Sequence, residues 1–162
     1  MNYTDEQIAQ WSEPEFQSAL LGFLGDKSRL LPGEWAIPNH GVIEYGIDIV
    51  FCRLDALGRP RYYGIQAKSK DIKLTQNRNN YDVKILLGQI AMAYNTRIPL
   101  PGESEKQRLS AFYILCSKTI SPQALEAIDK ATTNMPNLYH FDKNYIGGIF
   151  SEVGQHIGIL TQ

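Results

Sequence analysis

The sequence predicts an α/β sandwich in which a mixed β-sheet lies between helices. Three observations support this class. A capped helical pattern opens the chain, two alternating segments follow and are joined by a tight turn, and an unbroken apolar run then stands between two further helical patterns. The expected order is helix, three strands, helix, strand, helix, strand (αβββαβαβ). A length of 162 residues suits a single domain spanning residues 1–162.

The first helix is expected over residues 13–24. Its start is a capping box, Ser12-Glu13-Pro14-Glu15, followed by apolar residues at helical spacing. Residues 35–37 are a candidate short strand ended by Pro38. Residues 42–52 and 61–68 have the composition of longer strands, and the turn at 55–58, with Gly58, makes them a hairpin.

The second half of the chain alternates helices and strands. A helix capped by Asp82 is expected to reach about Asn95, and the stretch after it is expected to be an exposed loop. The apolar run 109–116 is typical of a central strand covered on both faces. A helix capped by Ser121 is expected to reach about Thr132, and residues 137–141 form a last strand. An amphipathic segment begins at Asp142, with apolar positions at Ile146, Ile149, Phe150 and Val153.

Composition excludes several classes of protein. Hydrophobic residues make up 43% and charged residues 20%, as expected of a folded chain. No run approaches the roughly 18 apolar residues of a membrane span, and the N-terminus lacks a signal peptide, so a cytoplasmic protein without membrane contact is expected. Cys52 and Cys116 lie in apolar runs and are interpreted as buried thiols. With no CxxC and three scattered histidines, a zinc site is not expected.

Charge is distributed unevenly along the chain. The net charge is −1, yet residues 1–50 carry two basic and eight acidic side chains, whereas residues 53–84 carry eight basic and three acidic ones. The basic stretch is either a solvated hairpin or an edge that faces phosphate groups.

The candidate chemistry lies on the predicted hairpin. A turn centred on Leu57 places residues whose numbers sum to about 114 opposite each other, which pairs Asp48 with Gln66. Lys68 follows on the same face, and Gly46 and Gly64 would leave room there for a substrate backbone. The opposite face, with the odd residues from Ile43 to Phe51, is expected to be core. The alternative is an ordinary strand acid that is solvated or paired with Lys68.

These residues carry a resemblance to a known family. Gly46-Ile47-Asp48, followed by Gly64-Ile-Gln66-Ala-Lys68 on a strand, resembles the PD-(D/E)XK nuclease superfamily in the QxK variant of Mrr-like restriction endonucleases. The resemblance covers most of the chain, including YILCSKTISPQALEAIDKA and LYHFD. It implies a restriction-endonuclease-like sandwich. Asp48 corresponds to the motif aspartate, Gln66 to the variable acidic position and Lys68 to the motif lysine.

The resemblance implies a Mg²⁺-dependent endonuclease that hydrolyses phosphodiester bonds of DNA, of the restriction or defence type. Asp48, Gln66 and the Ala67 carbonyl would hold Mg²⁺, for which Mn²⁺ could substitute, and Lys68 would orient the attacking water. Because Gln66 is neutral, a further carboxylate from the first helix is expected, with Glu15 as the candidate and Glu13 or Gln17 as rivals. Glu44 lies roughly 13 Å along the strand from Asp48, too far to share the ion.

The expected partner is nucleic acid, with DNA favoured over RNA. Five basic residues near the motif are the candidate phosphate contacts: Arg59, Arg61, Lys70, Lys73 and Arg78. Specificity would come from a homodimer, from a separate partner chain, or from loops such as 97–108. Two alternatives remain: a catalytically inactive nuclease-fold module that binds nucleic acid or a partner protein, and a small-molecule phosphohydrolase or non-enzymatic interaction domain.

Overall fold

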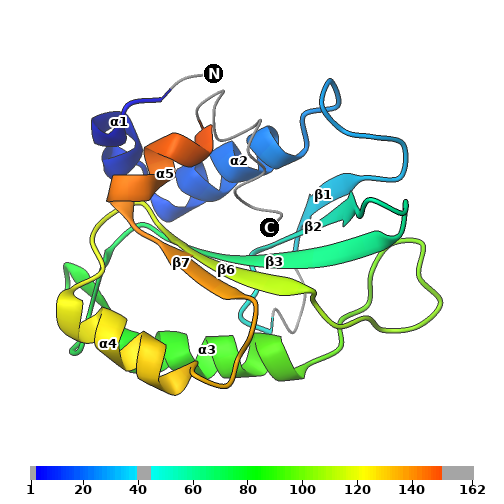
Figure 1. Cartoon of the computed structure of the whole chain (residues 1–162). Helices are drawn as coiled ribbons and strands as arrows, with labels where there is room; N and C mark the ends of the chain where they lie inside the picture. The colour runs from blue at the N-terminus through cyan, green and yellow to red at the C-terminus, as the bar shows by residue number, and fades with distance from the viewer. Residues whose placement is uncertain (1–2, 40–44, 151–162) are drawn as a thin grey trace.

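The computed structural model describes residues 3–39 and 45–150, which form a five-stranded mixed sheet between two helical layers (Figure 1). The strand order is β1-β2-β3-β6-β7, in which β2 is antiparallel to β1 and β3, and β3, β6 and β7 are parallel. A second, two-stranded sheet pairs β4 with β5. The strands are β1 (Trp35–Pro38), β2 (Ile49–Leu54), β3 (Pro60–Lys68), β4 (Asp71–Lys73), β5 (Asn80–Asp82), β6 (Ala111–Cys116) and β7 (Leu138–Phe141).

In the described part of the chain, five helices cover the two faces of the large sheet. On one face lie α1 (Asp5–Gln10), α2 (Glu13–Leu24) and α5 (Lys143–Phe150), and on the other lie α3 (Val83–Asn95) and α4 (Pro122–Ala131). Each face has its own buried cluster: Ile49, Phe51 and Ile65 pack toward α2, whereas Val50 and Cys52 pack toward α3 and α4. The coarse α/β prediction, a mixed sheet flanked by helices, is therefore confirmed.

The helix starts follow the caps that the sequence predicts. Ser12, Asp82 and Ser121 are the N-caps of α2, α3 and α4, and each side chain accepts a backbone N–H of its first turn. The apolar run at 109–116 becomes β6, which lies between β3 and β7 and is buried at every position. Cys52 and Cys116 are both buried, as predicted.

The β2–β3 hairpin has the predicted register. Ile49 pairs with Ile65 and Arg53 with Arg61, and Gly58 adopts a φ of +74° in the connecting turn. The predicted strand 42–52 is wrong at its start, however, because β2 begins only at Ile49. Tyr45 and Gly46 have left-handed φ values of +51° and +69°, which no strand accommodates.

This turn also overturns the predicted odd-numbered face. Tyr45 and Ile47 pack with the cluster on the α3 side, whereas Ile49 and Phe51 belong to the α2 side. The two-residue alternation of a strand therefore holds only after the chain leaves the turn. Ile43 and Glu44, which the sequence placed in the same strand, lie outside the described residues.

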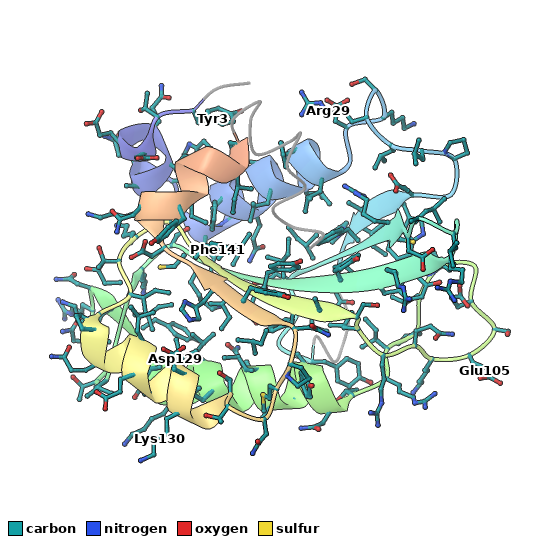
Figure 2. All side chains as sticks on the ribbon, viewed as in Figure 1. Tyr3, Arg29, Glu105, Asp129, Lys130 and Phe141 are labelled. Atoms are coloured by element: carbon teal, nitrogen blue, oxygen red, sulfur yellow. The ribbon has the colours of Figure 1, made fainter. Side chains whose placement is uncertain are left out.

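Three other differences from the sequence prediction are local. Helix α1 and the β4–β5 sheet were not expected. The loop after α3 is less exposed than predicted, because Ile98 and Leu100 are buried and Tyr62 Oη donates a hydrogen bond to Glu103. Figure 2 shows Glu105 of this loop at its outer edge.

The amphipathic segment predicted from Asp142 forms α5, a helix that the expected order did not include. It buries Ile146, Ile149 and Phe150, whereas Val153 lies beyond the described residues. Within residues 3–39 and 45–150, none of the helices has the length and apolar character needed to cross a membrane.

Candidate active site

A cleft of about 400 Å³ lies where β3 ends, between the start of α2, the turn before β2, and α3. In α/β sheets, ligands commonly bind beyond the carboxyl ends of strands, which is where this cleft lies. Its lining includes the three motif residues of the sequence prediction, Asp48, Gln66 and Lys68. The other lining residues are Glu13, Tyr45, Gly46, Gln89 and Met92.

Asp48 stands directly before β2 and contacts the end of β3. Its Oδ2 accepts hydrogen bonds from Gln66 Nε2 at 2.8 Å and from the backbone N–H of Ala67 at 2.7 Å. The Asp48 backbone N–H donates to the Ile65 carbonyl, so the hairpin ladder continues one residue past β2. The predicted juxtaposition of Asp48 and Gln66 is thus confirmed, and the part of the Ala67 backbone that contacts Asp48 is its N–H.

Gln66 is a buried polar side chain at this position. It is 2% exposed, and its Oε1 has no hydrogen-bond partner among the described residues. A buried acceptor without a partner is costly and needs a physical reason. An oxygen in this state, adjacent to a carboxylate, can be satisfied by a bound cation or by water.

Lys68 brings a positive charge into the same cleft. Its side chain is only 6% exposed, and Nζ lies 3.3 Å from Glu13 Oε1 and 4.8 Å from the centroid of the Tyr81 ring. Tyr81, on β5, donates a hydrogen bond from Oη to Gln89 Oε1 at 3.1 Å. A buried ammonium requires such partners, because it has lost nearly all contact with water.

The structure replaces Glu15 with Glu13 as the helix carboxylate at the cleft. Two residues apart on a helix are separated by roughly 200°, so the two side chains leave α2 in opposite directions. Glu15 completes the capping box by accepting hydrogen bonds from Ser12, and these bonds lower the pKa of its carboxyl. It lines a different cavity, with Trp11 and Phe23. Gln17 does not line the cleft.

The two glycines have packing roles that the sequence prediction did not anticipate. A Cβ at Gly46 would lie 2.7 Å from Gln89 Cβ, and a Cβ at Gly64 would lie 2.6 Å from Leu109 Cδ1. Gly46 therefore lets the turn approach α3, and Gly64 lies under a core side chain. The expectation that both clear space for a substrate is wrong for Gly64 and is met only at the rim by Gly46, which lines the cleft.

The predicted phosphate contacts fall into two separate groups. Arg59 and Arg61 lie at the turn end of the hairpin, where both form ion pairs with Asp55 at 3.1 and 3.3 Å. Lys68 lies seven residues after Arg61 on one strand, roughly 23 Å away at about 3.3 Å per residue. Arg59 and Arg61 are therefore remote from the cleft, contrary to the expectation.

The other three basic residues lie on the segment that follows Lys68. Lys70, Lys73 and Arg78 are all exposed, and they precede or belong to the β4–β5 unit that carries Tyr81. In Figure 1 this small green unit lies at the end of the sheet opposite the β2–β3 turn. These three residues remain candidates for phosphate contact.

The carboxylate and amide groups of the cleft could coordinate a metal ion through their oxygen atoms. Among the described residues no cluster of three or more His, Cys, Asp or Glu side chains could hold a metal ion, so any cation here would rely on Asp48, Glu13 and an amide oxygen. The buried Cys116 is no substitute ligand, because burial raises the pKa of its thiol to about 12.

The sequence prediction missed two residues of the site, Gln89 and Tyr81. A pattern in the sequence could have indicated Gln89. Gln89 lies three residues after Leu86 and four before Ala93, both of which are buried, so it is a polar residue within the apolar stripe of α3. Tyr81 left no comparable signal, because the β4–β5 sheet that positions it was not predicted.

Comparisons of the chain with protein-family models, with curated proteins and with solved structures give no match. The residues and geometry of the cleft are therefore the basis for inferring a function.

Proposed function

We propose that the chain is a Mg²⁺-dependent endonuclease that hydrolyses phosphodiester bonds of DNA, with a restriction-endonuclease-like core of the Mrr-like type. The observation that carries this proposal is a buried lysine, Lys68, in one cleft with the hydrogen-bonded pair Asp48–Gln66. Burying the Lys68 ammonium costs free energy, and such a group is retained mainly where it serves a site. The five-stranded mixed sheet flanked by helices is compatible with such a core.

The donor set suits a hard cation. Asp48 and Glu13 offer carboxylate oxygens, and Gln66 offers an amide oxygen that has no hydrogen-bond partner. Mg²⁺ typically takes one or two carboxylates and keeps several waters, so this small set is sufficient. The predicted participation of the Ala67 carbonyl remains part of the proposal. When bound, the cation would polarise the scissile phosphate and lower the pKa of a coordinated water.

The protein's own groups supply orientation and charge. Lys68 would donate hydrogen bonds from Nζ to the attacking water and to a phosphate oxygen, which stabilises the charge that develops at phosphorus. Glu13, 3.3 Å from Nζ, holds the ammonium in the cleft before substrate arrives. Lys70, Lys73 and Arg78 would contact backbone phosphates beside the cleft and set the register of the nucleic acid.

The test is cleavage of plasmid DNA by the purified chain with Mg²⁺ or Mn²⁺, compared with EDTA. Asp48→Asn and Lys68→Ala should abolish cleavage. Asp129→Asn and Lys130→Ala are matched controls that should retain cleavage, because both residues are exposed on α4 and neither lines the cleft (Figure 2). Absence of cleavage of single- and double-stranded DNA by the wild-type chain would overturn the proposal, and cleavage of RNA alone would reassign the substrate.

Gln66→Glu gives a second readout that does not depend on cleavage. It places a carboxylate 2.8 Å from Asp48 Oδ2, where like charges repel unless a cation lies between them. The variant should therefore unfold at a lower temperature than wild type in EDTA and gain more thermal stability from Mg²⁺. An equal response of the two proteins to Mg²⁺ would contradict a cation site at Gln66.

One observation favours a second candidate, an inactive nuclease-fold module that binds nucleic acid. Lys68 is paired with Glu13, and Asp48 accepts hydrogen bonds from Gln66 and Ala67. Much of the cleft's polarity is thus satisfied internally. DNA binding without cleavage in Mg²⁺ and Mn²⁺ would support this candidate over the nuclease.

A further inference from the structure

The Lys68 ammonium is held between two groups of different kinds. On one side is the Glu13 carboxylate, whose side chain is 38% exposed, and on the other is the face of the Tyr81 ring. A lysine has a long flexible stem, so a single contact with a partly solvated carboxylate leaves it considerable freedom. The aromatic face restricts the ammonium from a second direction and attracts its charge.

Tyr81 is itself held by α3. Its Oη donates to Gln89 Oε1 at 3.1 Å, and the backbone of Gln89 lies against Gly46, two residues before Asp48. A continuous series of contacts thus runs from the turn that precedes Asp48, through Gln89 and Tyr81, to Lys68. This route joins the two ends of the candidate site independently of the β2–β3 hydrogen bonds.

We propose that Tyr81 is a positioning residue that fixes the Lys68 ammonium through its ring face, with Gln89 fixing the ring. The contact itself is independent of any activity, and its consequence for cleavage rests on the function proposed above. The ring face of Tyr81 contacts the ammonium directly, whereas its hydroxyl only holds the ring in place through Gln89. Tyr81→Phe should therefore preserve most of it, and Tyr81→Leu should remove it.

The direct test is NMR of protein labelled with ¹³C at lysine Cε. A CH₂ group next to a charge that sits over an aromatic face is shifted upfield by the ring current, so one lysine signal should stand upfield of the others and disappear in Lys68→Ala. The signal should stay upfield in Tyr81→Phe and move to the bulk lysine position in Tyr81→Leu. Tyr145→Leu is the matched control, because Tyr145 is 64% exposed on α5 and should leave the signal unchanged.

The functional readout is the single-turnover cleavage rate, measured beside DNA affinity. Tyr81→Leu should lower the rate by roughly tenfold with little change in affinity, and Tyr81→Phe should restore most of it. A merely structural role would lower both quantities together or neither.

Two results would overturn the proposal. One is a Lys68 signal at the bulk position in wild type, which needs no variant to fold. The other is an upfield signal that persists in Tyr81→Leu. Failure of the proposed nuclease would look different, because the wild-type chain would show the upfield Lys68 signal and its loss in Tyr81→Leu yet cleave nothing.

Discussion

The two ends of the β2–β3 hairpin carry similar residues in opposite environments. At the turn end, Asp55 pairs with Arg59 and Arg61, whose side chains are 63% and 48% exposed. At the cleft end, Asp48 contacts Gln66 while Lys68 pairs with Glu13, and the Lys68 side chain is 6% exposed. Sequence alone assigned the basic residues of both ends to one nucleic-acid surface.

The charged residues at the turn end stabilise the backbone of the turn, whereas we assign those at the cleft end a role in catalysis. Asp55 accepts backbone N–H groups of Leu57 and Arg59 as well as its two ion pairs, so it organises the turn. Exposed pairs of this kind typically contribute at most about 1 kcal/mol. A stabilising role does not explain why Lys68 is buried, because a buried charge is often less stabilising than an apolar side chain of the same volume. We therefore place function at the cleft end.

The largest expected effect is on catalysis and distinguishes the two ends. Lys68→Ala should lower single-turnover cleavage by at least roughly a hundredfold, as loss of a group that stabilises transition-state charge usually does. Arg61→Ala should change it little, because Arg61 lies at the far end of β3. Quenched-flow or gel-based cleavage under excess enzyme measures both. Equal losses in the two variants would mean that the ends share one function.

Two glycines with similar backbone conformations sharpen the comparison through stability. Gly46 and Gly58 have φ values of +69° and +74°, but a Cβ would meet Gln89 at Gly46 and nothing within 4 Å at Gly58. Alanine in the left-handed region costs roughly 1–2 kcal/mol at either position. Gly46→Ala should lose a further 1 to 3 kcal/mol, roughly, from overpacking. Urea unfolding measures the difference, and equal losses would show that the cleft end is as loosely packed as the turn.

The sequence predicted the elements whose signals are local. The caps at Ser12, Asp82 and Ser121 and the turn at Gly58 start helices and close a hairpin through neighbouring residues alone. The register that joins Asp48 to Gln66 followed from the turn position and the two-residue period of strands.

The sequence predictions that were wrong or missing concern contacts between segments that are distant in the chain. Tyr45 and Gly46 leave the strand conformation at a turn that packs against α3, which alternation in the sequence does not reveal. The choice between Glu13 and Glu15 depended on which side of α2 faces the end of β3. Tyr81 reaches Lys68 only through a two-stranded sheet of three-residue strands, too short to give a periodic signal.

A smaller effect is expected in the salt dependence of DNA binding. Each phosphate contact contributes roughly 0.7 to 0.9 to the slope of log affinity against log salt concentration. Replacing Lys70, Lys73 and Arg78 together by alanine should flatten the slope by about two to three such contacts, because these exposed residues adjoin the cleft.

The matched control replaces Arg59 and Arg61 at the turn end, which should leave the slope nearly unchanged. Fluorescence anisotropy over a salt series measures both slopes. A larger change from the turn-end pair would place the nucleic acid at the wrong end of the hairpin for the proposed site.

The smallest expected effect is the acid sensitivity of the turn end. Hydrogen bonds from the Arg59 backbone N–H and from Leu57, with the nearby Arg59 charge, lower the pKa of Asp55 below its usual 3.8. A carboxyl with a depressed pKa in the folded state stabilises the fold above its unfolded-state pKa, and this contribution is lost as the pH falls through the folded-state value. Wild type should therefore lose part of its stability below about pH 4 through Asp55. Asp55→Asn should lack this part of the acid loss, while Glu126→Gln, which removes an exposed acid of α4, should follow wild type. Thermal melts from pH 7 to pH 2.5 test this, and identical pH profiles for wild type and Asp55→Asn would show that the Asp55 carboxylate does not organise the turn.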